Sequence, residues 1–179
     1  GGSFDAAPLR IPTSVYGVTK AMDEQMLATR DASGRGAYVA LRYFNAAGAD
    51  VSRLLGEDHS PETRLIPIVL QVALGQRDIL TLYGTHYDTP DGTAIRDFVS
   101  VADLAEAHVR CLDALLEGGA SATYNLGSGH GHTVGEIVDA ARDVTGHAIP
   151  TASGEPRAGD PERLIADCSK IRDAIGWRA

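Results

Sequence analysis

The stretch Arg96–Ser128, RDFVSVADLAEAHVRCLDALLEGGASATYNLGS, decides the fold class of the chain. It begins with a short strand-like run, continues into a strongly amphipathic helix pattern, and ends in a second strand-like run. Ser100 stands where an N-cap is expected, and Gly118 and Gly119 stand where the helix would end. A strand, a helix and a strand in succession predict parallel strands joined by a helical crossover, the repeating unit of α/β proteins.

The same alternation continues on both sides of this unit. Thr133 and Glu136 have the spacing of a capping box at the start of the next helix, and Gly75 is placed to end an earlier one. We therefore expect an α/β protein with largely parallel strand pairing. The predicted helices are 18–30, 65–75, 101–119, 133–144 and one that begins at 169, and the predicted strands are 38–45, 79–84, 96–100, 122–128 and 164–166.

Composition argues against nucleic-acid and membrane partners. The 179 residues carry 16 Lys plus Arg against 24 Asp plus Glu, for a formal net charge of -8. No apolar run approaches the ~18 residues that a membrane span needs. Two cysteines, Cys111 and Cys168, lie far apart in regular segments, which favours a reducing, cytoplasmic setting. Any bound anion must therefore be held by local arginines.

Tyr16 and Lys20 lie four residues apart at the start of a predicted helix, so they share one helical face. A tyrosine beside an ammonium group ionises more easily than a free one, which suits acid–base chemistry. Lys20 is one of only two lysines in the chain. The alternative is an aromatic side chain beside a solvated lysine on a helix surface.

Three other patterns are candidate sites. Gly127, Gly129 and Gly131 follow a strand and precede a helix, but His132 stands where the dinucleotide fingerprint needs its next glycine, so a tight turn is favoured. His130 and His132 lack a third ligand at a recognisable spacing, which argues against a metal. Arg96-Asp97 and Arg157-x-x-Asp160 each place a guanidinium near turn glycines, which suits either phosphate binding or surface salt bridges.

Several stretches together resemble one family. SVYGVTKAMDEQ, ALRYFNAAGAD, LIPIVLQVALGQRDILTLYGTHYDTPDGTAIRDFVSVADLAEAH, YNLGSGHGHTV and RAGDPERLIADCSKIRDAIGW resemble, in order and spacing, the second half of the UDP-glucose 4-epimerases, within the extended short-chain dehydrogenase/reductase group. The resemblance covers nearly the whole chain. It implies NAD-dependent interconversion of UDP-glucose and UDP-galactose through a 4-keto sugar, with NAD as cofactor and a UDP-hexose as substrate.

The resemblance also implies roles for individual residues. Tyr16 would be the catalytic acid–base, and Lys20 would assist it and bond the nicotinamide ribose. Arg64 stands where a smaller polar residue is usual. The implied cofactor-binding residues are Tyr16, Lys20, Tyr43 and Phe44, and the implied substrate-binding residues are Asn45, Arg64, Leu65, Thr81, Tyr83, Arg96, Arg157, Asp160 and Leu164.

The same resemblance implies a division of the chain. Residues 1–45 would belong to the NAD-binding Rossmann domain, cut at its N-terminus, and 46–179 mainly to a small α/β UDP-sugar-binding domain. Segments near 96–127 would return to complete the partial Rossmann-type parallel sheet. The family's glycine-rich cofactor loop and upstream Ser or Thr are missing, so we expect a fragment that is inactive alone, from an enzyme able to form a homodimer.

Two rival interpretations stay open from sequence. Other nucleotide-sugar enzymes of the same group, such as 4,6-dehydratases, use the same tyrosine and lysine. A non-catalytic module that retains only the UDP-sugar pocket would also keep most of these residues.

Overall fold

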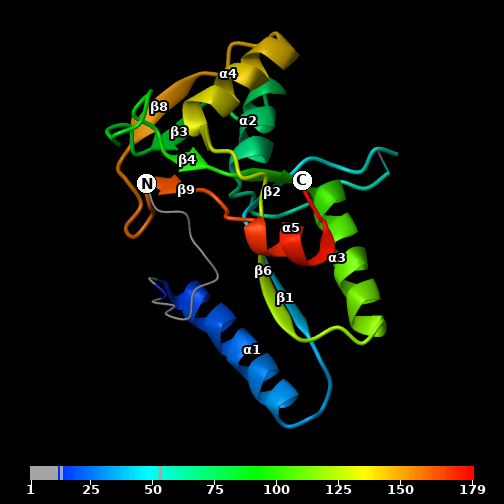
Figure 1. The fold of residues 1–179 in the computed structure, drawn as a ribbon. Helices are drawn as coiled ribbons and strands as arrows, with labels where there is room; N and C mark the ends of the chain where they lie inside the picture. Colours follow the sequence, from blue (N-terminus) through cyan, green and yellow to red (C-terminus); the bar gives the residue numbers. More distant parts are fainter. Residues whose placement is uncertain (1–11, 13, 53) are drawn as a thin grey trace.

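The computed structural model describes residue 12 and residues 14–52 and 54–179 (Figure 1). Helices and strands alternate along this part of the chain, as the sequence predicts. The helices are α1 (Val15–Ala32), α2 (Leu65–Ala73), α3 (Val101–Leu116), α4 (Val134–Thr145) and α5 (Ser169–Ile175). The strands are β1 (Val39–Tyr43), β2 (Asn45–Ala47), β3 (Leu80–Tyr83), β4 (Ile95–Arg96), β5 (Phe98–Ser100), β6 (Ala122–Leu126), β7 (His132–Thr133), β8 (Thr151–Gly154) and β9 (Arg163–Leu164).

Element boundaries follow local capping chemistry where it is present. α1 begins at Val15, three residues before the predicted start, because the side chain of Ser14 accepts a hydrogen bond from the Gly17 amide at 3.0 Å. The capping box of Thr133 and Glu136 at the start of α4 is confirmed. The short strands β7 and β8 were not predicted, since neither contains an apolar run.

The segment 39–47 changes its strand partner at Phe44. β1 pairs in parallel with β6, from Val39 opposite Ala122 to Tyr43 opposite Leu126. β2 then pairs in parallel with β5. The predicted strand 96–100 is likewise divided into β4 and β5. The segment therefore belongs to two pairs of hydrogen-bonded strands, or ladders: β1 with β6, and β2 with β5. The two ladders separate at Phe44.

The remaining strands form two further ladders. β3 and β8 pair in parallel. β4 lies between β7, which is antiparallel to it, and β9, which is parallel to it. Largely parallel pairing is therefore confirmed, and the pair of β4 with β7 is the antiparallel exception among the described residues.

Two hydrophobic cores hold these helices and strands together. One lies among β1, β6, α3 and α5, where the fully buried Trp177 also donates its indole N–H to the Asp103 carbonyl at 3.0 Å. The other lies among α2, α4 and β3. Figure 1 shows α2, α4, β3 and β8 gathered at one end, apart from α1, β1 and β6. The first core includes Val99, Leu104, Ala107, Cys111, Tyr124, Leu126, Ile171 and Trp177, and the second includes Val69, Val72, Leu80, Val138 and Ile149.

Asp97 lies where the two ladders separate, and its side chain connects this point to the segments that follow β6 and β9. Its side chain is fully buried and accepts hydrogen bonds from the amides of Ser128 at 2.8 Å, Gly129 at 3.0 Å and Ala166 at 3.1 Å. The Ser128 hydroxyl donates a fourth bond at 2.8 Å. A buried carboxylate is tolerated only when its oxygens are satisfied in this way.

The glycines of the 127–131 loop serve this packing. Gly129 has φ +75°, and a Cβ on Gly127 would collide with the Asp97 carboxylate and with Ala166. These glycines lie in a short loop from β6 to the two-residue β7, which leads directly into α4. The loop amides that a dinucleotide phosphate would use donate to Asp97 in this structure.

Replacing Asp97 with asparagine tests this packing. The Asn side chain must point an NH₂ group at some of the donors, which leaves buried groups unpaired, so we expect a loss of about 3 kcal/mol in the free energy of unfolding. Urea unfolding of the two proteins measures this. Asp139→Asn, at a carboxylate that is 72% exposed on α4, is the control and should change stability by less than about 0.5 kcal/mol. Equal stability of parent and Asp97→Asn would contradict the role given to Asp97.

Candidate active site

A cleft of about 720 Å³ opens where the two ladders diverge. Tyr43, Phe44 and Asn45, at the carboxyl end of β1 and the start of β2, line it. In α/β proteins, ligands bind outside the carboxyl ends of strands, at points where neighbouring strands separate. The cleft is therefore in the position that the fold class favours for a site.

Most of the residues that the sequence selected line this one cleft. Lys20 and Leu164 do not: Lys20 donates to Asp23 on α1, and Leu164 lies in β9, in register with Arg96 of β4. The selected residues in the cleft wall are Tyr16, Tyr43, Phe44, Asn45, Arg64, Leu65, Thr81, Tyr83, Arg96, Arg157 and Asp160.

Tyr16 presents its ring to the cleft from the first turn of α1. The residue is 72% exposed. The Lys20 ammonium lies 5.9 Å from the centre of the Tyr16 ring and donates a hydrogen bond to Asp23 at 3.0 Å. That hydrogen bond, followed by the charge of Asp23, raises the pKa of Lys20 above its ordinary value. Lys20 therefore stays charged beside Tyr16 but is held by an acidic neighbour.

Two arginines on the other side of the cleft have different environments. The Arg157 guanidinium lies over the Tyr83 ring, 4.4 Å from its centre, in a cation–π contact. Arg96 is buried; it donates to Asp160 at 2.6 Å and to the Ile95 carbonyl at 2.8 Å. Arg96 therefore ties β4 to the segment before β9, whereas Arg157 shields an aromatic face.

Sequence reasoning missed some residues of the cleft wall. Arg77 donates to Gln71 at 2.8 Å and to the Glu62 carbonyl at 3.4 Å. It follows Gly75 by two residues, so the rule that selected Arg96 and Arg157, a guanidinium near a turn glycine, also applies to it. Other missed residues include Ala46, Glu62, Thr63, Phe98 and Val134.

The described cleft wall is locally positive in an acidic chain. It contains four arginines, at 64, 77, 96 and 157, against the carboxylates of Glu62 and Asp160. The whole sequence carries a formal charge of -8. Arg64 also pairs with Glu57. This arrangement favours a small anion over an extended polyanion.

A family model matches most of the chain. Residues 3–127 match the NAD dependent epimerase/dehydratase family. The chain belongs to this family.

Curated proteins and solved structures of this family are similar to the chain. It is 49% identical over 167 residues to a UDP-glucose 4-epimerase of Halalkalibacterium halodurans, covering 93% of the chain and 50% of that relative. A crystal structure of a UDP-glucose 4-epimerase is 50% identical with a TM-score of 0.90, covering 94% and 51% of the two chains. The Bifidobacterium longum enzyme, solved with NAD+ and UDP, is 40% identical with a TM-score of 0.89, covering 98% and 52%. The chain spans about half the length of the curated relatives it matches.

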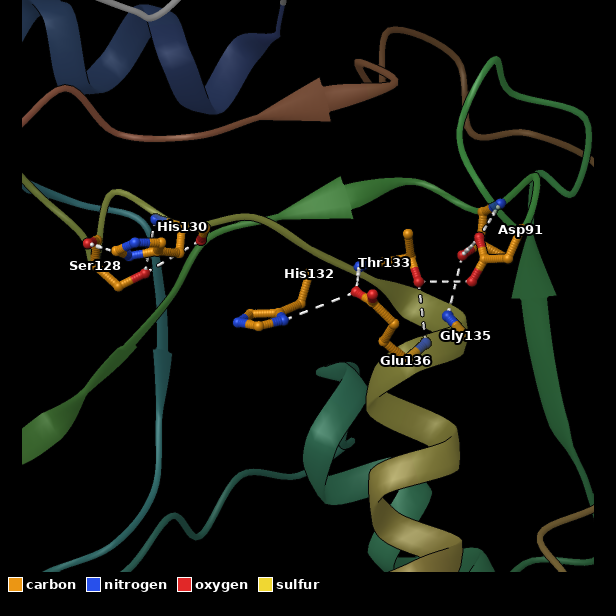
Figure 2. A network of polar contacts seen from close by, with 8 residues as sticks. Asp91, Ser128, His130, His132, Thr133, Gly135 and Glu136 are labelled. Carbon is orange, nitrogen blue, oxygen red and sulfur yellow. Dashed lines mark hydrogen bonds and ion pairs between the residues drawn. The ribbon is translucent and has the colours of Figure 1, made fainter.

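In this family member, a polar network holds the start of α4, where Val134 meets the cleft (Figure 2). Asp91 accepts hydrogen bonds from the Thr133 hydroxyl at 2.6 Å and from the Thr93 amide and hydroxyl at 2.8 and 2.7 Å. The Thr93 hydroxyl in turn accepts from the Gly135 amide at 3.0 Å. The network fixes α4 against the turn that precedes β4.

The two histidines of this region have separate contacts. His132 lies 3.7 Å from the Glu136 carboxylate, and the His130 ring contacts the Ser128 carbonyl at 3.0 Å (Figure 2). Within residues 12, 14–52 and 54–179, no group of three or more His, Cys, Asp or Glu side chains is arranged to hold a metal ion. The same residues include no helix with the length and apolar character needed to cross a bilayer.

The network predicts a pH-dependent stability. Burial opposes the ionisation of Asp91, but the hydrogen bonds from Thr133 and Thr93 outweigh it and hold the pKa of the carboxyl below its ordinary value of 3.8. A lowered pKa contributes stability above 3.8 that is lost as the pH falls through the folded-state pKa. Asp91→Asn should therefore lower the urea midpoint at pH 7 and lower it less at pH 3.

The control for this measurement is Asp113→Asn, at an exposed position of α3. It should leave the urea midpoint close to that of the parent at both pH values. A difference between Asp91→Asn and the parent that is as large at pH 3 as at pH 7 would contradict the role of the ionised carboxylate.

Proposed function

We propose that the chain forms part of an enzyme that interconverts UDP-glucose and UDP-galactose through a 4-keto sugar, with NAD as cofactor. The observation that carries this proposal is the single cleft, which combines Tyr16 and an aromatic lining on one wall with Tyr83 and Arg157 on the other. The similarity to UDP-glucose 4-epimerases across 93% of the chain supports it.

The residues present suit the nicotinamide end of NAD. Tyr16, Tyr43 and Phe44 give a flat apolar ring a lining of aromatic side chains, and Tyr43 is 54% exposed. Lys20, charged and next to Tyr16, is the proposed partner of the nicotinamide ribose. When bound, NAD supplies the acceptor and donor of hydride for C4 of the sugar. The Ser128 and Gly129 amides donate to Asp97, and the Gly127 and His130 amides donate to Cys168 and to the Ser128 hydroxyl, so the pyrophosphate is proposed to bind elsewhere.

Tyr16 is the proposed acid–base residue. Its phenol oxygen takes the proton from the sugar 4-hydroxyl as the C4–O bond becomes a carbonyl, and returns it when the hydroxyl forms again. The Lys20 ammonium stabilises the ionised phenol by its charge. Exposure of Tyr16 to the cleft gives the sugar access to that oxygen.

The opposite wall is proposed to hold UDP. Tyr83, Thr81 and Leu65 would form the uridine pocket. Arg157 and Arg96 would meet the diphosphate, and Asp160 the uridine ribose. Asn45 is proposed to meet the diphosphate from the first wall, and Arg64 to contact the substrate. Leu164 lies outside the described cleft wall, so its contact beside the 2-substituent of the sugar stays a prediction.

The wider setting is also part of the proposal. The enzyme would act in galactose metabolism in the cytoplasm, as a homodimer. Residues 1–45 would complete the NAD-binding domain together with segments near 96–127, and 46–179 would mainly bind the UDP-sugar. The parallel pairing of β1 with β6 and of β2 with β5 is compatible with that division.

Loss of the Tyr16 hydroxyl should reduce turnover. In the full-length protein that carries this sequence, Tyr16→Phe should lower kcat for UDP-galactose by at least about 100-fold, the usual contribution of a general acid–base group, with UDP affinity unchanged. Tyr38→Phe is the matched control, because Tyr38 lies before β1 and outside the cleft wall. Turnover of Tyr16→Phe within a few-fold of the parent would remove Tyr16 from the chemistry.

Loss of the Arg157 guanidinium should weaken nucleotide binding. Arg157→Ala removes a charged hydrogen-bond donor worth about 1.5–3 kcal/mol, so the Kd for UDP should rise at least about tenfold by titration calorimetry. Arg172→Ala, at an exposed guanidinium on α5, is the control and should bind UDP like the parent. Equal UDP affinity in Arg157→Ala and the parent would place the nucleotide elsewhere.

A further inference from the structure

A bidentate ion pair joins α1 to β1. The Nε and Nη2 atoms of Arg42 donate to the two carboxylate oxygens of Glu24, each at 2.7 Å. The two side chains are only 24% and 15% exposed. Paired N–H···O bonds of this kind fix orientation as well as distance, because the guanidinium and the carboxylate must be coplanar and aligned.

Within the described part of the chain, this ion pair is a direct side-chain contact between α1 and β1. None of its residues, all of which the structure describes, is buried. Val15, Met22 and Met26 are 84%, 61% and 64% exposed. Figure 1 shows α1 extending with β1 and β6 away from α2 and α4. Within the described residues, α1 therefore meets β1 through a polar contact, whereas α3 buries Leu104, Ala107 and Cys111.

The ion pair connects the helix that brings Tyr16 to the cleft with the strand that brings Tyr43 to it. Tyr16, Lys20 and Glu24 are spaced by four, so they run along one side of α1, with Glu24 about 12 Å along the axis from Tyr16. Arg42 immediately precedes Tyr43, which lines the cleft. A change in the angle of α1 at Glu24 is thus transmitted along the helix to Tyr16.

We propose that Glu24 and Arg42 are a positioning pair that sets the distance from the Tyr16 oxygen to the 4-oxygen of the sugar. This inference rests on the proposed function. The pair touches neither sugar nor cofactor; it acts through α1. Proton transfer needs the two oxygens about 2.6–3.2 Å apart, and an error of about 1 Å in such a geometry costs about 100-fold in rate.

The test is steady-state kinetics of the full-length protein with conservative variants. Glu24→Gln keeps the shape but removes the charge, and Arg42→Lys keeps the charge but removes the planar fork. Each should lower kcat for UDP-galactose by about tenfold or more while the KM changes less than about twofold. The double variant should fall no further than about twofold below the slower single variant, because the two residues act as one unit.

Glu106→Gln is the matched control. Glu106 pairs with Arg110 on the surface of α3, with both side chains close to half exposed, and its loss should leave kcat and KM unchanged. If Glu24→Gln and Arg42→Lys lower the melting temperature but keep the parent's kcat, the pair only stabilises the fold, and the positioning role is overturned.

Failure of the proposed function gives a different result. If the parent does not interconvert the two UDP-sugars, the function is wrong, and amide hydrogen exchange then tests the tether itself. Glu24→Gln should speed exchange in α1 relative to the parent and to Glu106→Gln. Unchanged exchange in α1 would overturn the tether independently of activity.

Discussion

A single buried carboxylate, that of Asp97, holds the central arrangement of this chain. Its side-chain oxygens accept hydrogen bonds from two amides that follow β6 and from one amide that follows β9, while its own backbone bonds Asn45 and Leu164. Three segments far apart in the sequence, at residues 45, 128–129 and 164–166, therefore meet at Asp97. Without these donors, burial of the Asp97 carboxylate would cost too much free energy. Without the carboxylate, the buried amides would be left unpaired.

The cleft is a result of that junction. Because segment 39–47 bonds β6 before Phe44 and β5 after it, the two ladders separate and leave a space at the carboxyl end of β1. Arg96 and Phe98, the neighbours of Asp97, line that space. Asp97, which joins the segments, is thus flanked by two residues of the cleft wall. The hydrogen bonds of Asp97 therefore determine the geometry of the cleft as well as that of the fold.

Local signals in the sequence predicted much of this architecture. α3 and α4 have clear N-caps and amphipathic patterns, and their starts were predicted at Val101 and close to Val134. The grouping of Tyr16 with Arg157 in one cleft came from family resemblance rather than from periodicity. β7 and β8 escaped detection because two or four polar and small residues form a strand only when a partner is already in place.

Long-range polar contacts were beyond sequence reasoning. The donors to Asp97 lie 31 to 69 residues away, and Asp97 reads locally as an ordinary acidic residue after an arginine. The hydrogen bond of Lys20 to Asp23 was also missed, although the spacing of three was visible. In both cases the hydrogen-bond partner depends on which groups lie nearby in the folded chain, and the residue types alone do not reveal it.

The two cores have a consequence for how such a protein diversifies. Tyr43 ends a strand of the first core, whereas Thr81 and Tyr83 belong to β3, whose Leu80 is buried in the second. Substitutions that reshape the second core move one wall of the cleft and leave the other in place. Selection can therefore reshape the wall proposed to hold the nucleotide by mutating one half of the architecture, while the wall that includes Tyr43 is inherited unchanged.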